Sequence, residues 1–264
     1  MTGPDSPSHL PSSAAVIDLQ QLRHSCASCA LHLLCVPGGL DAAGLARLEG
    51  IVRRRRRVRR GEQLFRMGDA LSSVYVASQG AFKTVHVTES GDAMLLGFHL
   101  PGELVGLDAL GSGVHRCEAV ALTDVQVCEL PYPQLDEIAR ELPGLQQQLL
   151  RVIGQSMGRD HDHLAVLMRR QASERLAAFL HGLTERYARI GLPPLQFALP
   201  MSREDIAQYL GLALETVSRG FSRLQDDGVI AVQGRRIGIV NPRELERLAH
   251  GIVPSLAAPQ PLAR

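Results

Sequence analysis

Glycine recurs at short intervals between Gln63 and Leu130, and this spacing limits what the first half of the chain can fold into. Between the glycines lie short runs rich in β-branched and aromatic residues, namely Ser73–Ala77, Phe82–Val87, Met94–Phe98 and Val125–Leu130. Such runs are typical of strands, and Thr88–Asp92 between two of them has the composition of a hairpin turn. Many short strands at this spacing predict a small barrel or jelly roll.

After Pro143 the pattern changes to that of a long helix that continues to about Arg170. Apolar residues on this helix are spaced three and four apart, with one acidic exception, at Leu149, Ile153, Met157, Asp160, Leu164 and Leu167. A narrow apolar stripe is typical of a coiled coil and predicts a partner helix, for which a second copy of the chain is the simplest source. The alternative is a connector helix that packs on its own barrel.

The last third of the chain reads as a winged helix-turn-helix. An amphipathic helix over Ser173–Ala188 comes first, and Ser202 with Asp205 resembles a capping box at the start of the next helix. Gly211 then turns the chain into a helix over about Leu214–Asp226. The runs Val229–Val232 and Ile237–Val240 predict a hairpin.

The second helix of this motif has one polar and one apolar face. Helical spacing puts Glu215, Ser218, Arg219 and Ser222 together, opposite Val217, Phe221 and Leu224. Glu215 suits a cytosine amino group, Arg219 suits a guanine, and Arg223 can reach a phosphate. The alternative is a helical bundle with a charged solvated face. Because residues 201–240 hold five arginines and five acidic residues, affinity for DNA must come from placed contacts and helix N-termini rather than from bulk charge.

Three of the five cysteines crowd together as Cys26-x2-Cys29-x5-Cys35. Thiolates in such a cluster suit zinc or an iron–sulfur cluster, both of which take four ligands. The fourth ligand could be Cys128, Cys117, His24 or His32. Buried thiols without a metal are the alternative, whereas an odd cysteine count argues against a disulfide framework.

Composition excludes several other classes of protein. No run of 18 apolar residues exists, and the N-terminus lacks the pattern of a signal peptide, so we expect a cytoplasmic protein with no membrane span. With 4% aromatic residues and no Trp, single-strand binding by stacked bases is not expected. Seven arginines within Arg53–Arg60 read as a solvated face rather than a nucleic-acid patch. The sequence shows no pairing of a nucleophile with a general base, so we do not expect an enzyme.

These features divide the chain into five parts. We expect a flexible tail over 1–20, a domain with the cysteine loop and the strands over 21–140, and a dimerisation helix over 141–170. The winged helix-turn-helix then occupies 171–250, and a second flexible tail occupies 251–264.

One glycine-rich turn resembles a phosphate-binding cassette. It runs from Pro101 to Leu110 and is followed by Arg116 and Cys117. On its own such a turn is weak evidence for a ligand, and a purely structural roll is the favoured interpretation.

The order of cysteine loop, β-roll, long helix and helix-turn-helix resembles that of the CRP/FNR family. Within this family, the chain most resembles the oxygen-responsive FNR branch. The resemblance covers about Cys26–His250 and rests on the cysteine spacing, on Gly97–Leu100 before Gly102–Gly106, and on Glu215–Arg219. It implies an α+β fold with a cyclic-nucleotide-binding-like β-roll, a long dimerisation helix and a C-terminal winged helix-turn-helix.

The resemblance also implies a function. Cys26, Cys29, Cys35 and Cys128 would hold a [4Fe–4S] cluster that promotes a homodimer under anaerobic conditions, with Cys117 as an extra thiol. Glu215, Ser218 and Arg219 would read palindromes of TTGAT-type half-sites in double-stranded DNA, and the turn Glu89–Asp92 would contact RNA polymerase, as expected of an activator. From the stripe itself we add a hypothesis: Asp160, beside Met157, opposes dimerisation of the cluster-free protein.

Two other functions remain open at this point. One is a nucleotide- or haem-gated regulator of the same architecture. In the cyclic-AMP branch the cassette carries a Gly-Glu ribose contact and an Arg-Ser phosphate contact, whereas this chain has Gly106–Leu107 and Arg116–Cys117. The other is a zinc-stabilised DNA-binding protein without a sensing role.

Overall fold

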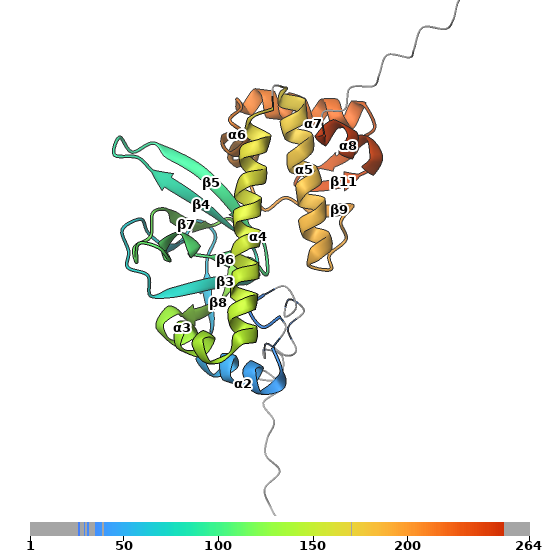
Figure 1. The fold of residues 1–264 in the computed structure, drawn as a ribbon. Helices are drawn as coiled ribbons and strands as arrows, with labels where there is room; N and C mark the ends of the chain where they lie inside the picture. The colour runs from blue at the N-terminus through green and yellow to red at the C-terminus, as the bar shows by residue number, and fades with distance from the viewer. Residues whose placement is uncertain are drawn as a thin grey trace, which may run out of the picture.

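The computed structural model describes residues 26, 29, 31, 35–38, 40–169 and 171–250. Along the chain a β domain is followed by a long helix and a small, mainly helical domain (Figure 1). This order is the α+β arrangement that the sequence predicts. The predicted tails, 1–20 and 251–264, lie outside the described residues.

Two four-stranded antiparallel sheets form the β domain, in the orders β1-β8-β3-β6 and β2-β7-β4-β5. Their strands are β1 (Arg53–Val58), β2 (Gln63–Phe65), β3 (Ser73–Gln79), β4 (Phe82–Val87), β5 (Ala93–His99), β6 (Leu104–Val105), β7 (Glu118–Ala121) and β8 (Val125–Pro131). Apolar residues of both sheets, such as Phe82, Val105 and Val127, form a common core. This is the predicted roll.

Two short helices cover the outer face of the first sheet. They are α2 (Ala42–Ile51) and α3 (Tyr132–Glu141), and a 3-10 turn, η1 (Leu107–Ala109), follows β6. The Asp41 side chain caps α2, because its Oδ1 atom accepts a hydrogen bond from the Gly44 amide at 2.7 Å. Leu48 of α2 and Leu135 of α3 pack with Val74 and Val76 of β3 in a second core.

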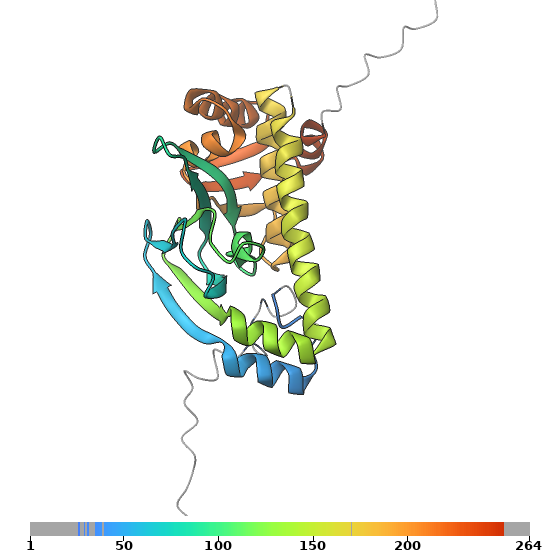
Figure 2. The same ribbon diagram turned by 60° about the vertical axis from the view of Figure 1, so that its left-hand side comes forward.

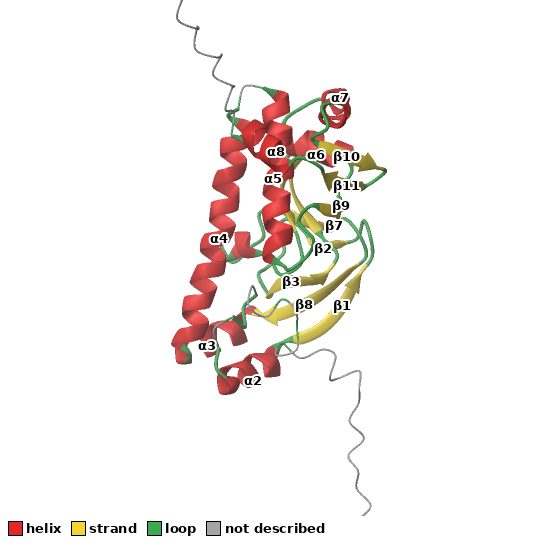
Figure 3. Cartoon of the chain, turned by 90° about the vertical axis from the view of Figure 1, so that its right-hand side faces the viewer, coloured by secondary structure: helices red, strands yellow, loops and turns green. Residues whose placement is uncertain are grey.

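The long helix α4 (Pro143–Leu167) contains 25 residues. It passes alongside both domains, and the views of Figures 2 and 3 agree on this. Its buried residues are Leu145, Gln148 and Val152, in the part that lies against the β domain. The connector packing that was the alternative is thus realised here, and Leu149 of the stripe packs against the same core, whereas Met157 and Leu164 of the stripe are exposed.

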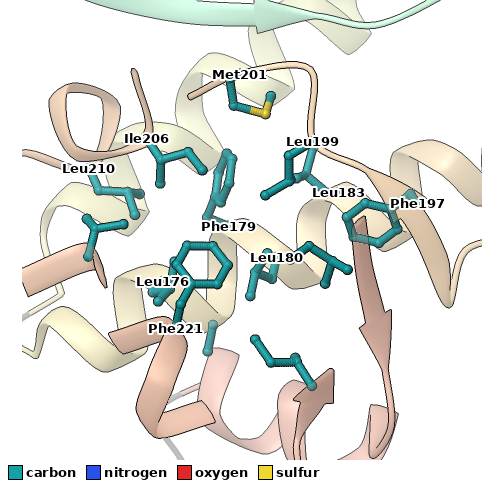
Figure 4. Close-up of a cluster of buried hydrophobic side chains, with 14 of the residues drawn as sticks. Leu176, Phe179, Leu180, Leu183, Phe197, Leu199, Met201, Ile206, Leu210 and Phe221 are labelled. Atoms are coloured by element: carbon teal, nitrogen blue, oxygen red, sulfur yellow. The ribbon is translucent and has the colours of Figure 1, made fainter. Parts of the chain in front are cut away.

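The C-terminal domain has a core (Figure 4) that continues into β-domain residues such as Phe98 and Leu100. Its elements are α5 (Ala172–Arg189), β9 (Gln196–Ala198), α6 (Arg203–Leu210), α7 (Leu214–Asp226), β10 (Ile230–Gln233), β11 (Arg236–Ile239) and α8 (Pro242–Ala249). Strands β10, β11 and β9 form a three-stranded antiparallel sheet. The predicted helix pair and hairpin are both confirmed.

The arginine run forms a strand of its own, β1, which lies at the edge of its sheet. The side chains of Arg53, Arg56, Arg57, Arg59 and Arg60 are exposed, as a solvated face requires. No helix in the described part of the chain is both long and apolar enough to span a membrane.

Candidate metal centre and nucleic-acid interface

The helix-turn-helix is held by local hydrogen bonds that its sequence encodes. At the start of α6 the Asp205 amide donates to Ser202 Oγ at 3.0 Å, and the Ser202 amide donates to Asp205 Oδ2 at 2.8 Å. This is the predicted capping box. Gly211 ends α6 with a φ of 61°, a left-handed conformation that glycine adopts without a steric penalty. The turn therefore places α7 at a fixed angle to α6.

The two faces of α7 are those that the sequence predicts. Val217, Phe221 and Leu224 are buried in one cluster with Ile206 and Leu210 of α6. The polar residues of the opposite face are all exposed, namely Glu215, Ser218, Arg219, Ser222 and Arg223. Helix α7 therefore presents a polar surface with side chains suited to base edges and phosphates.

Two contacts around α7 were not anticipated from the sequence. The Arg223 side chain lies 3.7 Å from Asp227, in an exposed ion pair. Gln225 Oε1 accepts a hydrogen bond from the Val232 amide at 3.1 Å and so joins α7 to the wing strand β10. An Asp four residues after an Arg on a helix is a local signal for the first contact, whereas the second depends on the tertiary fold.

The structure brings four of the five thiols into one pocket. Cys26, Cys29 and Cys35 precede α2, whereas Cys128 lies in β8, and all four line the same cavity. Cys128 reaches it because Val125 and Val127 point into the roll core, so that alternation along the strand turns Cys128 to the other face. The remaining lining is mostly apolar and consists of Leu31, Val36, Pro37, Leu48, Val52, Val76, Ser78 and Leu130.

The fifth thiol lies elsewhere. Cys117 is buried in the roll core, and its Sγ–H donates to Asp108 Oδ2 at 3.4 Å. His24 and His32, the other ligands that the sequence left open, lie outside the described residues. Among the described candidates for a fourth ligand, only Cys128 shares the pocket of Cys26, Cys29 and Cys35.

The thiol pocket is electrostatically unfavourable for free thiolates. Burial raises the pKa of the Cys35 thiol well above its usual range, and the nearby Cys128, Cys26 and Cys29 raise it further, while a hydrogen bond to the Val36 backbone opposes the shift. A bound cationic centre would compensate for this cost, because thiolates are the form that binds metals. As they stand, no three His, Cys, Asp or Glu side chains of the described residues are grouped to hold a single metal ion.

The candidate dimer surface lies on the exposed side of α4. Met157 and Leu164 are 56% and 59% exposed, and Asp160 between them is exposed as well. Burial raises the pKa of Asp160, and nearby Arg159, His163 and His161 lower it in part. Among the ion pairs of the described residues, none joins Asp160 to Arg159 or Arg169, and Arg159 pairs with Glu103 instead.

The cassette-like turn is closed by its own acidic residue. Asp108 Oδ2 accepts a hydrogen bond from the Arg116 amide at 2.7 Å and also receives the Cys117 thiol. Asp108 Oδ1 lies 3.2 Å from Nδ1 of the buried His115. A negative carboxylate thus occupies donors that a phosphate would need. Asp108 was not among the candidate residues that the sequence predicts.

Comparisons with known proteins agree with this architecture. The cyclic nucleotide-binding domain family matches residues 55–141, and the Crp-like helix-turn-helix domain family matches residues 174–248. The fumarate and nitrate reduction regulatory protein of Escherichia coli strain K12 is 42% identical over 224 residues, which are 85% of this chain and 90% of that protein. The protein of the same name from Salmonella typhimurium strain LT2 is also 42% identical over the same shares.

Solved structures show the same fold. FixK2 from Bradyrhizobium japonicum matches with a TM-score of 0.68 and 32% identity, over 75% of this chain and 97% of that one. A CRP-family transcriptional regulator from Thermus thermophilus matches with a TM-score of 0.58 and 25% identity, over 74% and 96%. The chain therefore belongs to the CRP/FNR family of DNA-binding transcription regulators and, as its sequence predicts, is not an enzyme.

Proposed function

We propose that the protein is an oxygen-responsive regulator that holds a [4Fe–4S] cluster through Cys26, Cys29, Cys35 and Cys128. The observation that carries the proposal is the shared pocket of these four thiols, which come from segments about 90 residues apart. In such a cluster each iron takes one thiolate, so the thiols need to surround a volume rather than converge on one ion. When bound, the cluster supplies a redox group that oxygen can oxidise.

The residues around the thiols fit this role. The apolar lining limits the access of water, and solvent exposure is one of the factors that tune iron–sulfur clusters. Gln148 of α4 donates a hydrogen bond from Nε2 to the Cys35 carbonyl oxygen at 2.9 Å. A movement of the cysteine loop would therefore strain or break this hydrogen bond to α4.

The proposal includes a homodimer formed through α4. Leu150, Met157 and Leu164 are exposed apolar residues of this helix, and a second copy of the stripe would cover them. Two Asp160 carboxylates would then approach each other across the two-fold axis and oppose association. We infer that this near-balance leaves the cluster-free protein monomeric and lets the cluster favour the dimer.

In the dimer, the α7 helices would read palindromes of TTGAT-type half-sites. Glu215, Ser218 and Arg219 would contact base edges, and Arg223 would contact a phosphate. The exposed hairpin turn Glu89–Asp92, at the tip of β4 and β5, would contact RNA polymerase during activation. Such an activity on chromosomal DNA requires a cytoplasmic protein, and its five parts would be those expected from the sequence.

The cassette weighs against a nucleotide-gated regulator. Leu107 and Cys117 replace the acid and the hydroxyl of the cyclic-AMP branch, and Asp108 already takes the Arg116 amide. A phosphate would meet a carboxylate of the same charge at this turn. A structural zinc site remains the second candidate, because four cysteines also suit zinc.

Anaerobic purification distinguishes these functions. We expect a brown protein with about four irons and four sulfides per chain that binds a TTGAT palindrome, and loses both properties in air. A colourless protein with one zinc per chain would support the zinc-stabilised alternative. A colourless, metal-free protein whose DNA affinity rises with added cyclic AMP would support the nucleotide-gated one.

A further inference from the structure

Three parts of the molecule meet at one buried carboxylate, that of Glu103. Glu103 lies in the turn before β6 of the β domain. Arg186 of α5 binds it through two hydrogen bonds, from Nε to Oε1 at 3.0 Å and from Nη2 to Oε2 at 2.6 Å. Arg159 of α4 places its Nε atom 3.9 Å from Oε1. One carboxylate thus links the sensor domain, the dimerisation helix and the DNA-binding domain.

The backbone of the β domain completes this group. Arg186 Nη2 also donates to the Phe98 carbonyl oxygen at 2.6 Å, and Glu103 Oε2 accepts from the Leu100 amide at 2.9 Å. The side chains of Glu103 and Arg186 are 13% and 15% exposed. Burial raises the pKa of Glu103, but Arg186 and Arg159 outweigh it and hold that pKa below its usual range. The carboxylate is therefore charged and paired at neutral pH.

Apolar packing joins the same two domains without fixing their angle. Phe98 and Leu100 of the β domain belong to one buried cluster with Phe179 and Leu180 of α5. Apolar contacts are not directional, so the cluster tolerates small rotations. A bidentate arginine–carboxylate pair is directional, because its two parallel hydrogen bonds fix the planes of both groups. A second charged contact, Lys83 Nζ to Asp205 Oδ1 at 2.6 Å, joins β4 to the start of α6.

The cysteine loop lies next to this group. A Cβ atom at Gly102 would come within 3.6 Å of Leu31 Cδ2 and within 3.9 Å of Ile190 Cγ2. Leu31 lies between the thiols of the loop, and Ile190 ends α5. The residue before Glu103 is therefore packed between the cysteine loop and the DNA-binding domain.

The recognition surface remains open while these contacts are made. Glu215, Ser218 and Arg219 are exposed, so the contacts at Glu103 do not mask α7. Arg159 lies on α4 and Arg186 on α5, and these helices are separated only by residues 168–171, so the shared carboxylate joins them across this connection. Two recognition helices of a dimer must lie one helical turn of DNA apart, about 34–36 Å, and this separation depends on the angle between α4 and α5.

We propose that Glu103 is a positioning residue that orients the DNA-binding domain by clamping Arg186 and Arg159. Without the clamp the domain samples several angles about residues 168–171, and only a fraction of dimers match the spacing of the half-sites. The apparent dissociation constant for DNA then rises by the inverse of that fraction. The inference uses the proposed dimer, but not the cluster itself.

The test replaces the pair by apolar residues of similar length in E103M/R186M. Replacing a buried ion pair by apolar residues often keeps stability, but this variant also leaves Arg159, the Leu100 amide and the Phe98 carbonyl oxygen without these partners. We therefore expect a lower Tm in a protein that still folds, with unchanged cluster content and sedimentation, about tenfold weaker binding to the palindrome and an unchanged base preference. Trypsin is expected to cleave faster after Arg169. The control, D136A/R140A, removes an exposed pair within α3 and is expected to behave as wild type.

Each outcome bears on the proposal. A folded, dimeric E103M/R186M protein with wild-type DNA affinity and wild-type cleavage overturns it. If that variant does not fold, R186K decides, because lysine keeps the charge but loses the bidentate geometry. In R186K, severalfold weaker DNA binding supports the proposal, and wild-type binding overturns it. A wild-type protein that fails to dimerise or to bind the palindrome contradicts the proposed function instead.

Discussion

The side-chain amide of Gln148 donates a hydrogen bond to the backbone carbonyl oxygen of Cys35, which is 113 residues earlier in the chain. Gln148 is polar but only 6% exposed, and it lies on the same buried face of α4 as Leu145 and Val152. A buried polar side chain is tolerated when it is hydrogen-bonded. Here the acceptor is the backbone carbonyl oxygen of Cys35, whose thiol lines the pocket. This bond is a direct contact between the thiol pocket and helix α4.

We predict that Gln148→Leu destabilises the conformation in which the cysteine loop can hold the cluster. The change leaves the Cys35 carbonyl without its donor and costs about 1–3 kcal/mol. The expected result is a lower iron and sulfide content after anaerobic reconstitution and faster loss of the cluster colour in air. Gln147→Leu is the matched control, because Gln147 is exposed on the same helix. Equal cluster lifetimes in the two variants would contradict the role of Gln148.

Cys128 and Cys117 are expected to differ completely in cluster assembly. Cys128→Ser removes a thiol from the pocket and is predicted to abolish the cluster and anaerobic DNA binding. Cys117→Ser lies in the roll core, where the serine hydroxyl can keep the hydrogen bond to Asp108, so both properties are expected to remain. Iron analysis and visible absorption check this. A colourless Cys117→Ser protein beside a brown Cys128→Ser protein would reverse the assignment.

Arg219 and Arg223 are expected to act differently on DNA. Arg219→Ala is predicted to cost about 1–3 kcal/mol and to relax the preference at one base pair. Arg223→Ala is predicted to weaken binding to all sequences and to lower the salt slope by about one. Binding to a set of single-base operator variants at several salt concentrations measures both. A uniform loss of affinity in Arg219→Ala would exclude its role in base readout.

Asp160→Ala is predicted to make the cluster-free protein dimerise and bind DNA in air. Two unit charges about 4 Å apart repel each other by about 1–4 kcal/mol at the effective dielectric constants of water and of protein surfaces. Sedimentation in air checks the oligomeric state. A monomeric Asp160→Ala protein at micromolar concentration would show that this carboxylate does not control association.

The same carboxylate predicts a pH dependence. Burial raises the pKa of Asp160, and a second carboxylate across the dimer axis would raise it further. Association then takes up protons, so the cluster-free dimer is expected to become more stable as the pH falls through this raised pKa. Burial lowers the pKa of His163 on the same helix, so the comparison is with Asp160→Ala, in which the carboxylate-dependent part must vanish. An identical pH profile in both proteins would contradict the prediction.

Local patterns in the sequence predicted the elements that carry function. The capping box at Ser202, the turn at Gly211 and the two faces of α7 depend on residues close in sequence, and the structure has all three. Strand β1 was missed because consecutive arginines show no alternation. It forms because backbone pairing with β8 needs no apolar side chain on an exposed edge.

The contacts between distant parts of the chain could not be predicted. Glu103 and Arg186 are 83 residues apart, and neither residue type at its position indicates a buried pair. Asp108 closes the cassette through the Arg116 amide, a contact that depends on the exact path of the turn. Helix α8 had a usable signal, since Asn241 before Pro242 is a common helix start, and the Asn241 side chain does cap it.

The edge position of β1 has a consequence for assembly. An uncovered strand edge can pair with a strand of another chain, and repeated pairing of this kind leads to open-ended aggregation. Here a second copy approaching edge to edge would meet Arg53, Arg56 and Arg57 with its own three arginines, and like charges opposite each other resist pairing, although the ion pairs of Arg53 with Glu129 and of Arg57 with Asp124 offset part of this repulsion. The charged edge thus weighs against edge-to-edge growth of the sheet, and the exposed apolar residues of α4 remain the candidate surface for a second copy.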